Sequence, residues 1–198
     1  GAFDGWNLST TYALEAIGWS GLLIEPVPER AASLASTRPY SKSLHAALGP
    51  PDCPPSVTLH MNIDNGAGGL HSHTDTSTKL AAAMRANNHW TIQQVQVPQF
   101  SLNQLAHLIP TPLDLLSLDI EGLETDALRG FDLHHFKPRL IIVEDNDEPN
   151  RQPVADFMTS QPYTLLGKYA VNLFYAHNDA QDIIIRSRQL PQFASWRH

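Results

Sequence analysis

The 198-residue sequence is poor in cysteine and in basic residues, and it contains no long apolar run. Because Cys53 is the single cysteine, this chain cannot form an internal disulfide, and we expect a reducing, cytoplasmic compartment. The 13 lysines and arginines stand against 20 aspartates and glutamates, which gives a formal net charge of −7. They form no basic cluster, so we expect no nucleic-acid partner. No apolar run reaches the roughly 18 residues of a membrane-spanning helix, so we expect no membrane span.

The remaining composition is that of a globular chain. Hydrophobic residues make up 42% of it and charged residues 17%, and the length suits one domain, which we take as residues 1–198. Short apolar runs alternate with segments of helical spacing, which is typical of βαβ units. The sequence therefore predicts an α/β fold: an open, mostly parallel sheet with helices on both faces and an antiparallel C-terminal hairpin.

The individual elements follow from the same patterns. Apolar runs predict strands within residues 21–26, 42–48, 57–64, 91–98, 113–119 and 138–145. Helical spacing predicts helices at residues 12–17, 29–37, 101–109 and 123–130. Residues 163–177 and 182–188 predict two or three paired strands, and residues 65–78 a polar loop.

Acidic residues follow three of the predicted strands. Glu25 ends one strand about 20 residues after Gly5, a distance at which a carboxylate can accept hydrogen bonds from ribose hydroxyls. Asp119 and Glu121 end a central strand, and Glu144 ends its neighbour. Because open α/β sheets bind ligands beyond the carboxyl ends of their strands, we expect these acids to face one pocket. Alternatively, Glu25 is a solvated strand end, and the acids near Glu121 and Glu124 are favourable charges in the first turn of a helix.

Two stretches carry a family resemblance. GAFDGWNLSTTYALEAIGWSGLLIEPVPE (residues 1–29) resembles the opening motif of the FkbM family of S-adenosylmethionine-dependent methyltransferases, and DLLSLDIEGLETDALRGFD (residues 114–132) resembles its second hallmark, D-x-E-G-x-E after a hydrophobic strand. The resemblance spans about residues 1–146 and implies the Rossmann-like class I methyltransferase fold. In that fold the glycine turn follows a central first strand, so we expect this strand to be missing from the chain.

The resemblance also implies a set of cofactor contacts. The glycine turn would surround the methionine part of S-adenosylmethionine, with Asp4 near its ammonium group, and Glu25 would hold the ribose hydroxyls. Residues 45–47 would approach the adenine edge, and Asp119 would lie beside the reacting methyl group. The implied cofactor-binding residues are Gly1, Ala2, Asp4, Gly5, Glu25, Pro26, Ala46 and Asp119.

The implied reaction is methyl transfer to a hydroxyl group of a sugar, glycan or natural product. Such a hydroxyl is a poor nucleophile at neutral pH, so a base or a metal ion should help to remove its proton. We expect Asp119, Glu121 and Glu144 to be the catalytic carboxylates. Asp119 and Glu144, with Asp145, could bind Mg²⁺ through oxygen ligands, or could bind the cofactor without a metal.

Three alternatives stay open from the residues alone. His71, His73 and Asp75 would face one way in an extended segment and could hold a metal, or they could be solvated loop residues. Glu25 would also suit the ribose of NAD in an oxidoreductase, although the turn lacks the third glycine of G-x-G-x-x-G. The chain could also be a catalytically silent Rossmann-like binding domain.

Overall fold

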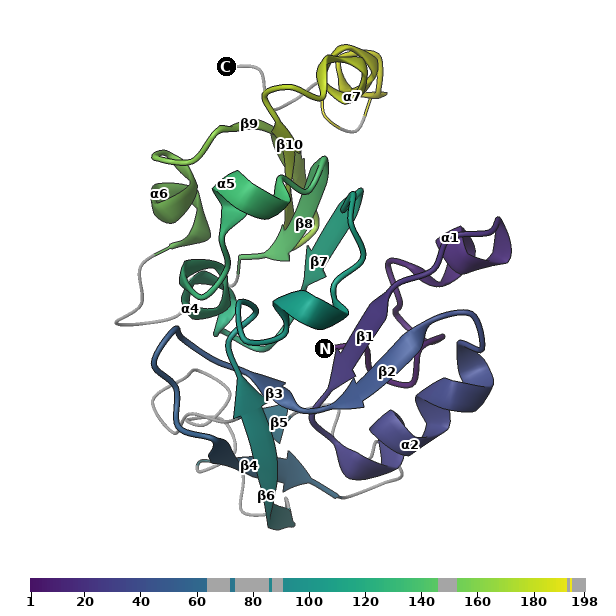
Figure 1. Ribbon diagram of the computed structural model, residues 1–198, viewed down its shortest axis with the longest axis vertical. Helices are drawn as coiled ribbons and strands as arrows, with labels where there is room; N and C mark the ends of the chain where they lie inside the picture. Colours follow the sequence, from purple (N-terminus) through teal and green to yellow (C-terminus); the bar gives the residue numbers. More distant parts are fainter. Residues whose placement is uncertain (64–71, 74–85, 87–90, 146–152, 192, 194–198) are drawn as a thin grey trace.

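The strands of the computed structural model form three hydrogen-bonded sheets, arranged around the start of the chain (Figure 1). The structure describes residues 1–63, 72–73, 86, 91–145, 153–191 and 193. Within them, no helix combines the length and the apolar character needed to cross a bilayer.

The first sheet is a short βαβ unit. Strands β1 (Leu22–Glu25) and β2 (Lys42–His45) are parallel, and helix α2 (Pro28–Thr37) connects them. Pro28 can begin the helix because the first helical position needs no backbone N–H. The side chains of Ala31 and Leu34 are buried, so one face of α2 packs inward. This unit brings the carboxyl end of β1 to the middle of the molecule (Figure 1).

The second sheet has the order β7-β8-β10-β9. Strands β7 (Leu115–Leu118) and β8 (Leu140–Glu144) are parallel, and α4 (Glu124–Arg129) and α5 (Leu133–Phe136) lie between them in the chain. Helix α6 (Val154–Met158) follows β8, and β9 (Tyr163–Tyr169) and β10 (Asn172–His177) then pair in antiparallel fashion. This pairing confirms the predicted C-terminal hairpin.

One predicted strand in this region is wrong. Residues 182–188 were expected to be extended, but helix α7 spans Gln181–Ser187. The side chains of Ala180, Ile184 and Ser187 are buried while Ile185 is 54% exposed, which is the spacing of a helix face and not the alternation of a strand. The three consecutive isoleucines favour a strand locally, but only the helix face that carries Ala180, Ile184 and Ser187 is buried.

The third sheet has the order β3-β6-β4-β5, with β3 (Ala47–Leu48), β4 (Ser56–Asn62), β5 (Ser72–His73) and β6 (Ile92–Phe100). Residues 42–48 were predicted as one strand, but they form β2 and β3 in two different sheets. The break falls at Ala46, whose backbone N–H donates to the Glu25 carbonyl oxygen at 3.2 Å. The helix predicted for residues 101–109 is reduced to turns and a short 3-10 helix, η2 (Ala106–Leu108).

The edges of β1 and β7 face each other across the start of the chain, without direct pairing between the two strands. The Ala2 N–H donates to the Ile24 carbonyl oxygen at 3.0 Å, and the Gly1 nitrogen donates to the Asp119 carbonyl oxygen. The described strands thus form three sheets where one continuous sheet was expected. The expected strand before Gly1 stays a prediction.

Candidate functional site

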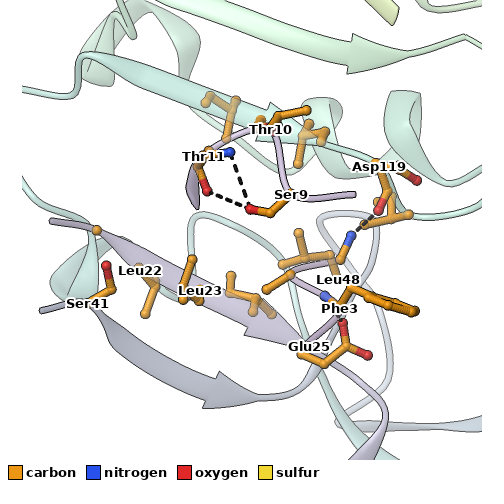
Figure 2. A pocket seen from close by; sticks show the side chains of 18 of the residues that line it. Phe3, Ser9, Thr10, Thr11, Leu22, Leu23, Glu25, Ser41, Leu48 and Asp119 are labelled. Carbon is orange, nitrogen blue, oxygen red and sulfur yellow. Dashed lines mark hydrogen bonds between the residues drawn. The ribbon is translucent and has the colours of Figure 1, made fainter. Parts of the chain in front are cut away.

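A cavity of about 420 Å³ lies between β1, β7 and the loop of residues 1–11 (Figure 2). It brings together most of the residues singled out from the sequence. The predicted residues that line it are Gly1, Ala2, Glu25, Pro26, Ala46, Asp119, Glu121 and Glu144. Asp4 and Gly5 lie in the same loop but are not among the residues that line the cavity.

Glu25 is held in place by the backbone around it. Its side chain is 3% exposed, and its two carboxylate oxygens accept hydrogen bonds from the N–H groups of Phe3 at 2.8 Å and Val27 at 3.0 Å. Each carboxylate oxygen can accept more than one hydrogen bond, so acceptor capacity remains for a ligand hydroxyl. A Cβ on Gly1 would come within 2.9 Å of Glu25 Oε2, so glycine permits the close approach of the chain to this carboxylate.

The glycine turn is built around Asp4. Its Oδ1 accepts from the N–H groups of Trp6 at 2.9 Å and Asn7 at 2.8 Å, and its Oδ2 accepts from the Asn7 side chain at 2.6 Å. Burial acts to raise the pKa of Asp4, but these hydrogen bonds and the nearby Arg30 guanidinium outweigh it, so the pKa lies below 3.8. The carboxylate of Asp4 therefore shapes the loop, and the contact to the cofactor ammonium group that the resemblance implies stays a prediction.

Helix α2 and the segment after it anchor the turn. Thr37 Oγ1 donates to the Asp4 carbonyl oxygen at 2.8 Å, and Arg38 Nη1 donates to the Gly5 carbonyl oxygen at 3.3 Å. Arg38 also forms a buried ion pair with Glu15 of helix α1 (Tyr12–Ala16), with 2.7 Å between Nε and Oε2. This network could not be predicted from the sequence, because it joins residues that no local pattern connects.

A second group of acids lies where β7 and β8 end. Carboxylate oxygens of Asp119, Glu124 and Glu144 lie within 4.8 Å of one another. Glu124 Oε1 accepts from the N–H groups of Ile120 at 2.8 Å and Gly122 at 3.2 Å. Burial raises the pKa of Glu124 above 4.5, although these hydrogen bonds act against it. Among the described residues, Glu124 takes the place in this acid cluster that the sequence analysis gave to Asp145.

Arg30 and Phe3 were also missed from the sequence, although both line the pocket. The Arg30 guanidinium carbon lies 3.8 Å from the centroid of the Phe3 ring. A sequence signal existed, because Arg30 is the third residue of a helix that begins shortly after the acidic end of β1.

The residues predicted to approach the adenine edge do not all line the pocket. Ala46 and Ala47 line it, whereas His45 is not in the lining and its Nε2 lies 3.0 Å from the Pro26 carbonyl oxygen.

The histidine-rich hypothesis lies outside what the structure describes. His71 and Asp75 are not among the described residues, and for His73 only the backbone, in β5, is described. The metal site in this loop therefore stays a prediction.

A glycine loop and three acidic strand ends around one pocket define an α/β protein of the kind that binds a ligand at the carboxyl ends of its strands. The sequence matches the family model described as "Methyltransferase FkbM domain" over residues 1–184. The chain therefore belongs to the FkbM methyltransferase family, which confirms the resemblance and makes methyl transfer its class of activity. Searches of curated proteins and of solved structures gave no match.

Proposed function

We propose that this protein transfers a methyl group from S-adenosylmethionine to a hydroxyl group of a sugar, glycan or natural product. The observation that carries the proposal is the shared pocket, which Glu25 reaches from β1 and Asp119, Glu121 and Glu144 reach from β7 and β8. An acid-rich pocket suits a cofactor that carries a positively charged sulfur and an ammonium group.

The residues present fit such a cofactor. Glu25 is buried, oriented by two backbone N–H groups and still able to accept hydrogen bonds from ribose hydroxyls. Gly1 and Ala2 leave room beside it, and Ala46 and Ala47 add a small apolar surface after β2. When bound, S-adenosylmethionine supplies a methyl group that is electrophilic because its sulfur is positively charged.

The acids at the ends of β7 and β8 would act on the acceptor. Asp119, Glu121 and Glu144 line the pocket, so each can accept the proton of an acceptor hydroxyl that is aligned for attack. Removing that proton during attack makes the oxygen a better nucleophile. Alignment of the acceptor oxygen with the methyl group and its sulfur supplies much of the remaining rate enhancement.

Mg²⁺ is part of the proposal as a second cofactor. The carboxylate oxygens of Asp119, Glu124 and Glu144 are close enough to share one cation, and oxygen ligands are those that Mg²⁺ prefers. Dialysis against a chelator should then lower methyl transfer at least about tenfold, and added Mg²⁺ should restore it. Activity unchanged by the chelator would remove the metal from the proposal.

The test of the main proposal is a binding measurement followed by a turnover measurement. Isothermal calorimetry should detect S-adenosylhomocysteine binding and no NAD binding. Transfer of a radioactive methyl group to a panel of sugars and hydroxylated natural products should then identify the acceptor. Binding of NAD alone would support the oxidoreductase alternative, and cofactor binding with no turnover across the panel would support the silent binding domain.

A further inference from the structure

Arg30 lies in the pocket but has no part in the function proposed above. It is the third residue of α2, and its guanidinium covers the ring of Phe3. A cation over an aromatic ring is attracted by the negative face of the ring, and the attraction is stronger when water is excluded. Phe3 in turn has a φ of 55°, a conformation that non-glycine residues rarely adopt. The stacked guanidinium is therefore placed to hold Phe3 in a backbone conformation that it would otherwise leave.

The conformation of Phe3 matters because its N–H is one of the two donors that orient Glu25. That N–H lies 2.8 Å from Glu25 Oε2, the oxygen nearest to Gly1 (Figure 2). A change of φ at Phe3 requires the peptide units on its two sides to rotate relative to each other, and a rotation of the Ala2–Phe3 unit would turn this donor away from Glu25. The carboxylate would then keep only the Val27 N–H, which holds the other oxygen.

Arg30 also has acids from several parts of the chain around it. Its electrostatic neighbours are Asp4 in the glycine turn, Glu25 at the end of β1, Glu29 on its own helix and Glu121 after β7. Burial lowers the pKa of the guanidinium and these carboxylates offset only part of that effect, but an arginine stays protonated. A fixed positive charge here reduces the mutual repulsion of the carboxylates around the pocket.

We propose that Arg30 is a positioning residue, which acts through Phe3 to orient the Glu25 carboxylate toward the ribose of the cofactor. The inference rests on the proposed function, because it needs a ribose in this pocket. It assigns to Arg30 an effect on hydroxyl recognition, which a purely structural arginine would not have.

The experiment compares two ligands, S-adenosylhomocysteine and its 2′-deoxy analogue, by calorimetry. The wild-type protein should prefer the hydroxylated ligand by at least about 30-fold, because a site built around a hydroxyl rejects the analogue that lacks it. Arg30→Met keeps the length of the side chain and removes the charge, and this preference should fall to within about threefold. Phe3→Leu keeps the backbone N–H and removes the ring, and it should have the same effect. Arg186→Met, on the exposed side of α7, is the matched control and should keep the wild-type preference.

The double variant tests whether Arg30 acts through Phe3. If Arg30 acts through Phe3, Arg30→Met combined with Phe3→Leu should lose no more than either single variant. Thermal unfolding shows that each variant is folded, and Phe3→Leu keeps the test open if Arg30→Met is not. A wild-type preference in folded Arg30→Met, or additive losses in the double variant, would overturn the inference. Failure of the wild-type protein to bind S-adenosylhomocysteine would instead overturn the proposed function, and this inference with it.

Discussion

Glu25 illustrates how one side chain joins the stability of the loop to the chemistry of the pocket. It is 3% exposed, and its oxygens accept backbone N–H groups from both the glycine turn and the start of α2. A buried carboxylate with two such donors is rigid, and its remaining acceptor positions point where the surrounding backbone directs them. The same residue can therefore shape the loop and recognise a hydroxyl.

Replacing Glu25 separates these effects. In Glu25→Gln an NH₂ group replaces one carboxylate oxygen, so either the Phe3 or the Val27 N–H would face another donor. The negative charge is lost as well. We expect S-adenosylhomocysteine to bind about 10- to 100-fold more weakly, measured by calorimetry. Asp156→Asn, on the exposed side of α6 and away from the pocket, is the control and should bind like the wild-type protein. Unchanged affinity in Glu25→Gln would contradict the role given to Glu25.

Three glycines differ in how strongly their backbone conformation and surroundings require a glycine. Gly5 has a φ of +80°, and a Cβ there would come within 2.8 Å of Arg38 Cγ and 2.9 Å of Leu34 Cδ2. Gly18 has a φ of +99° with open space around it, and Gly21 has neither constraint. We expect Gly5→Ala to lower the free energy of unfolding by roughly 2–4 kcal/mol and Gly18→Ala by about 1 kcal/mol. Gly21→Ala should be neutral or stabilising by up to about 1 kcal/mol. Chemical denaturation measures all three, and a different rank order would contradict this account of the turn.

At the scale of elements, a buried ion pair joins α1 to Arg38, the residue that follows α2, and Arg38 also donates to the Gly5 carbonyl oxygen in the glycine turn. The side chains of Arg38 and Glu15 are 4% and 6% exposed, and Ser41 and the Tyr40 N–H also donate to Glu15. Burial acts to raise the pKa of Glu15, but the hydrogen bonds from Ser41, Tyr40 and Arg38 outweigh it, so the pKa lies below 4.5. The ionised carboxylate is therefore the form that the folded protein favours.

The lowered pKa of Glu15 determines how the stability of the folded protein depends on pH. Because the folded protein lowers the pKa of Glu15, the stabilisation is complete above about pH 4.5 and is lost as the pH falls through the folded-state pKa. Glu15→Gln should lower the free energy of unfolding by about 3–5 kcal/mol at pH 7, since it leaves the Arg38 charge buried without its partner. The difference from the wild-type protein should shrink as the pH approaches 3. A constant difference from pH 7 to pH 3 would contradict the ion-pair explanation, and Glu29→Gln serves as the exposed control.

The elements differ in how well the sequence predicted them. Strands β1, β4, β6, β7 and β8 follow from local patterns, because a run of β-branched and apolar residues bounded by glycine, proline or acids has few alternatives. Residues 182–188 were misassigned because three isoleucines favour a strand locally, whereas the surroundings bury only one face. The break at Ala46 could not be predicted either, because it depends on which strand edges pair: β2 pairs with β1, whereas β3 pairs with β6.

At the scale of the whole molecule, the pocket lies between two sheets. Acids at the ends of β1, β7 and β8 could be expected to meet, because parallel strands place their carboxyl ends at one edge. The division into three sheets could not be predicted, since it depends on which strand edges pair and not on where strands occur. The Arg38–Glu15 pair, and the places that Arg30 and Glu124 take beside the other pocket residues, could not be predicted for the same reason, because they arise from contacts between elements.

A ligand in this position should stabilise both sides of the pocket together. Gly1 and Ala2 already connect the ends of β7 and β1, and Thr10 Oγ1 lies 2.8 Å from Ser117 Oγ on β7. Saturating S-adenosylhomocysteine should therefore slow amide hydrogen exchange in the loop of residues 1–11, at the end of β1 and in the turn after β7, while the β9–β10 hairpin keeps its rates. A ligand at about 100 times its dissociation constant stabilises the folded state by about 2.7 kcal/mol, which is enough for the change to be measured. Protection confined to β1 and its loop would mean that the acids after β7 do not share the pocket in solution, because a ligand bound between the sheets has to restrain both.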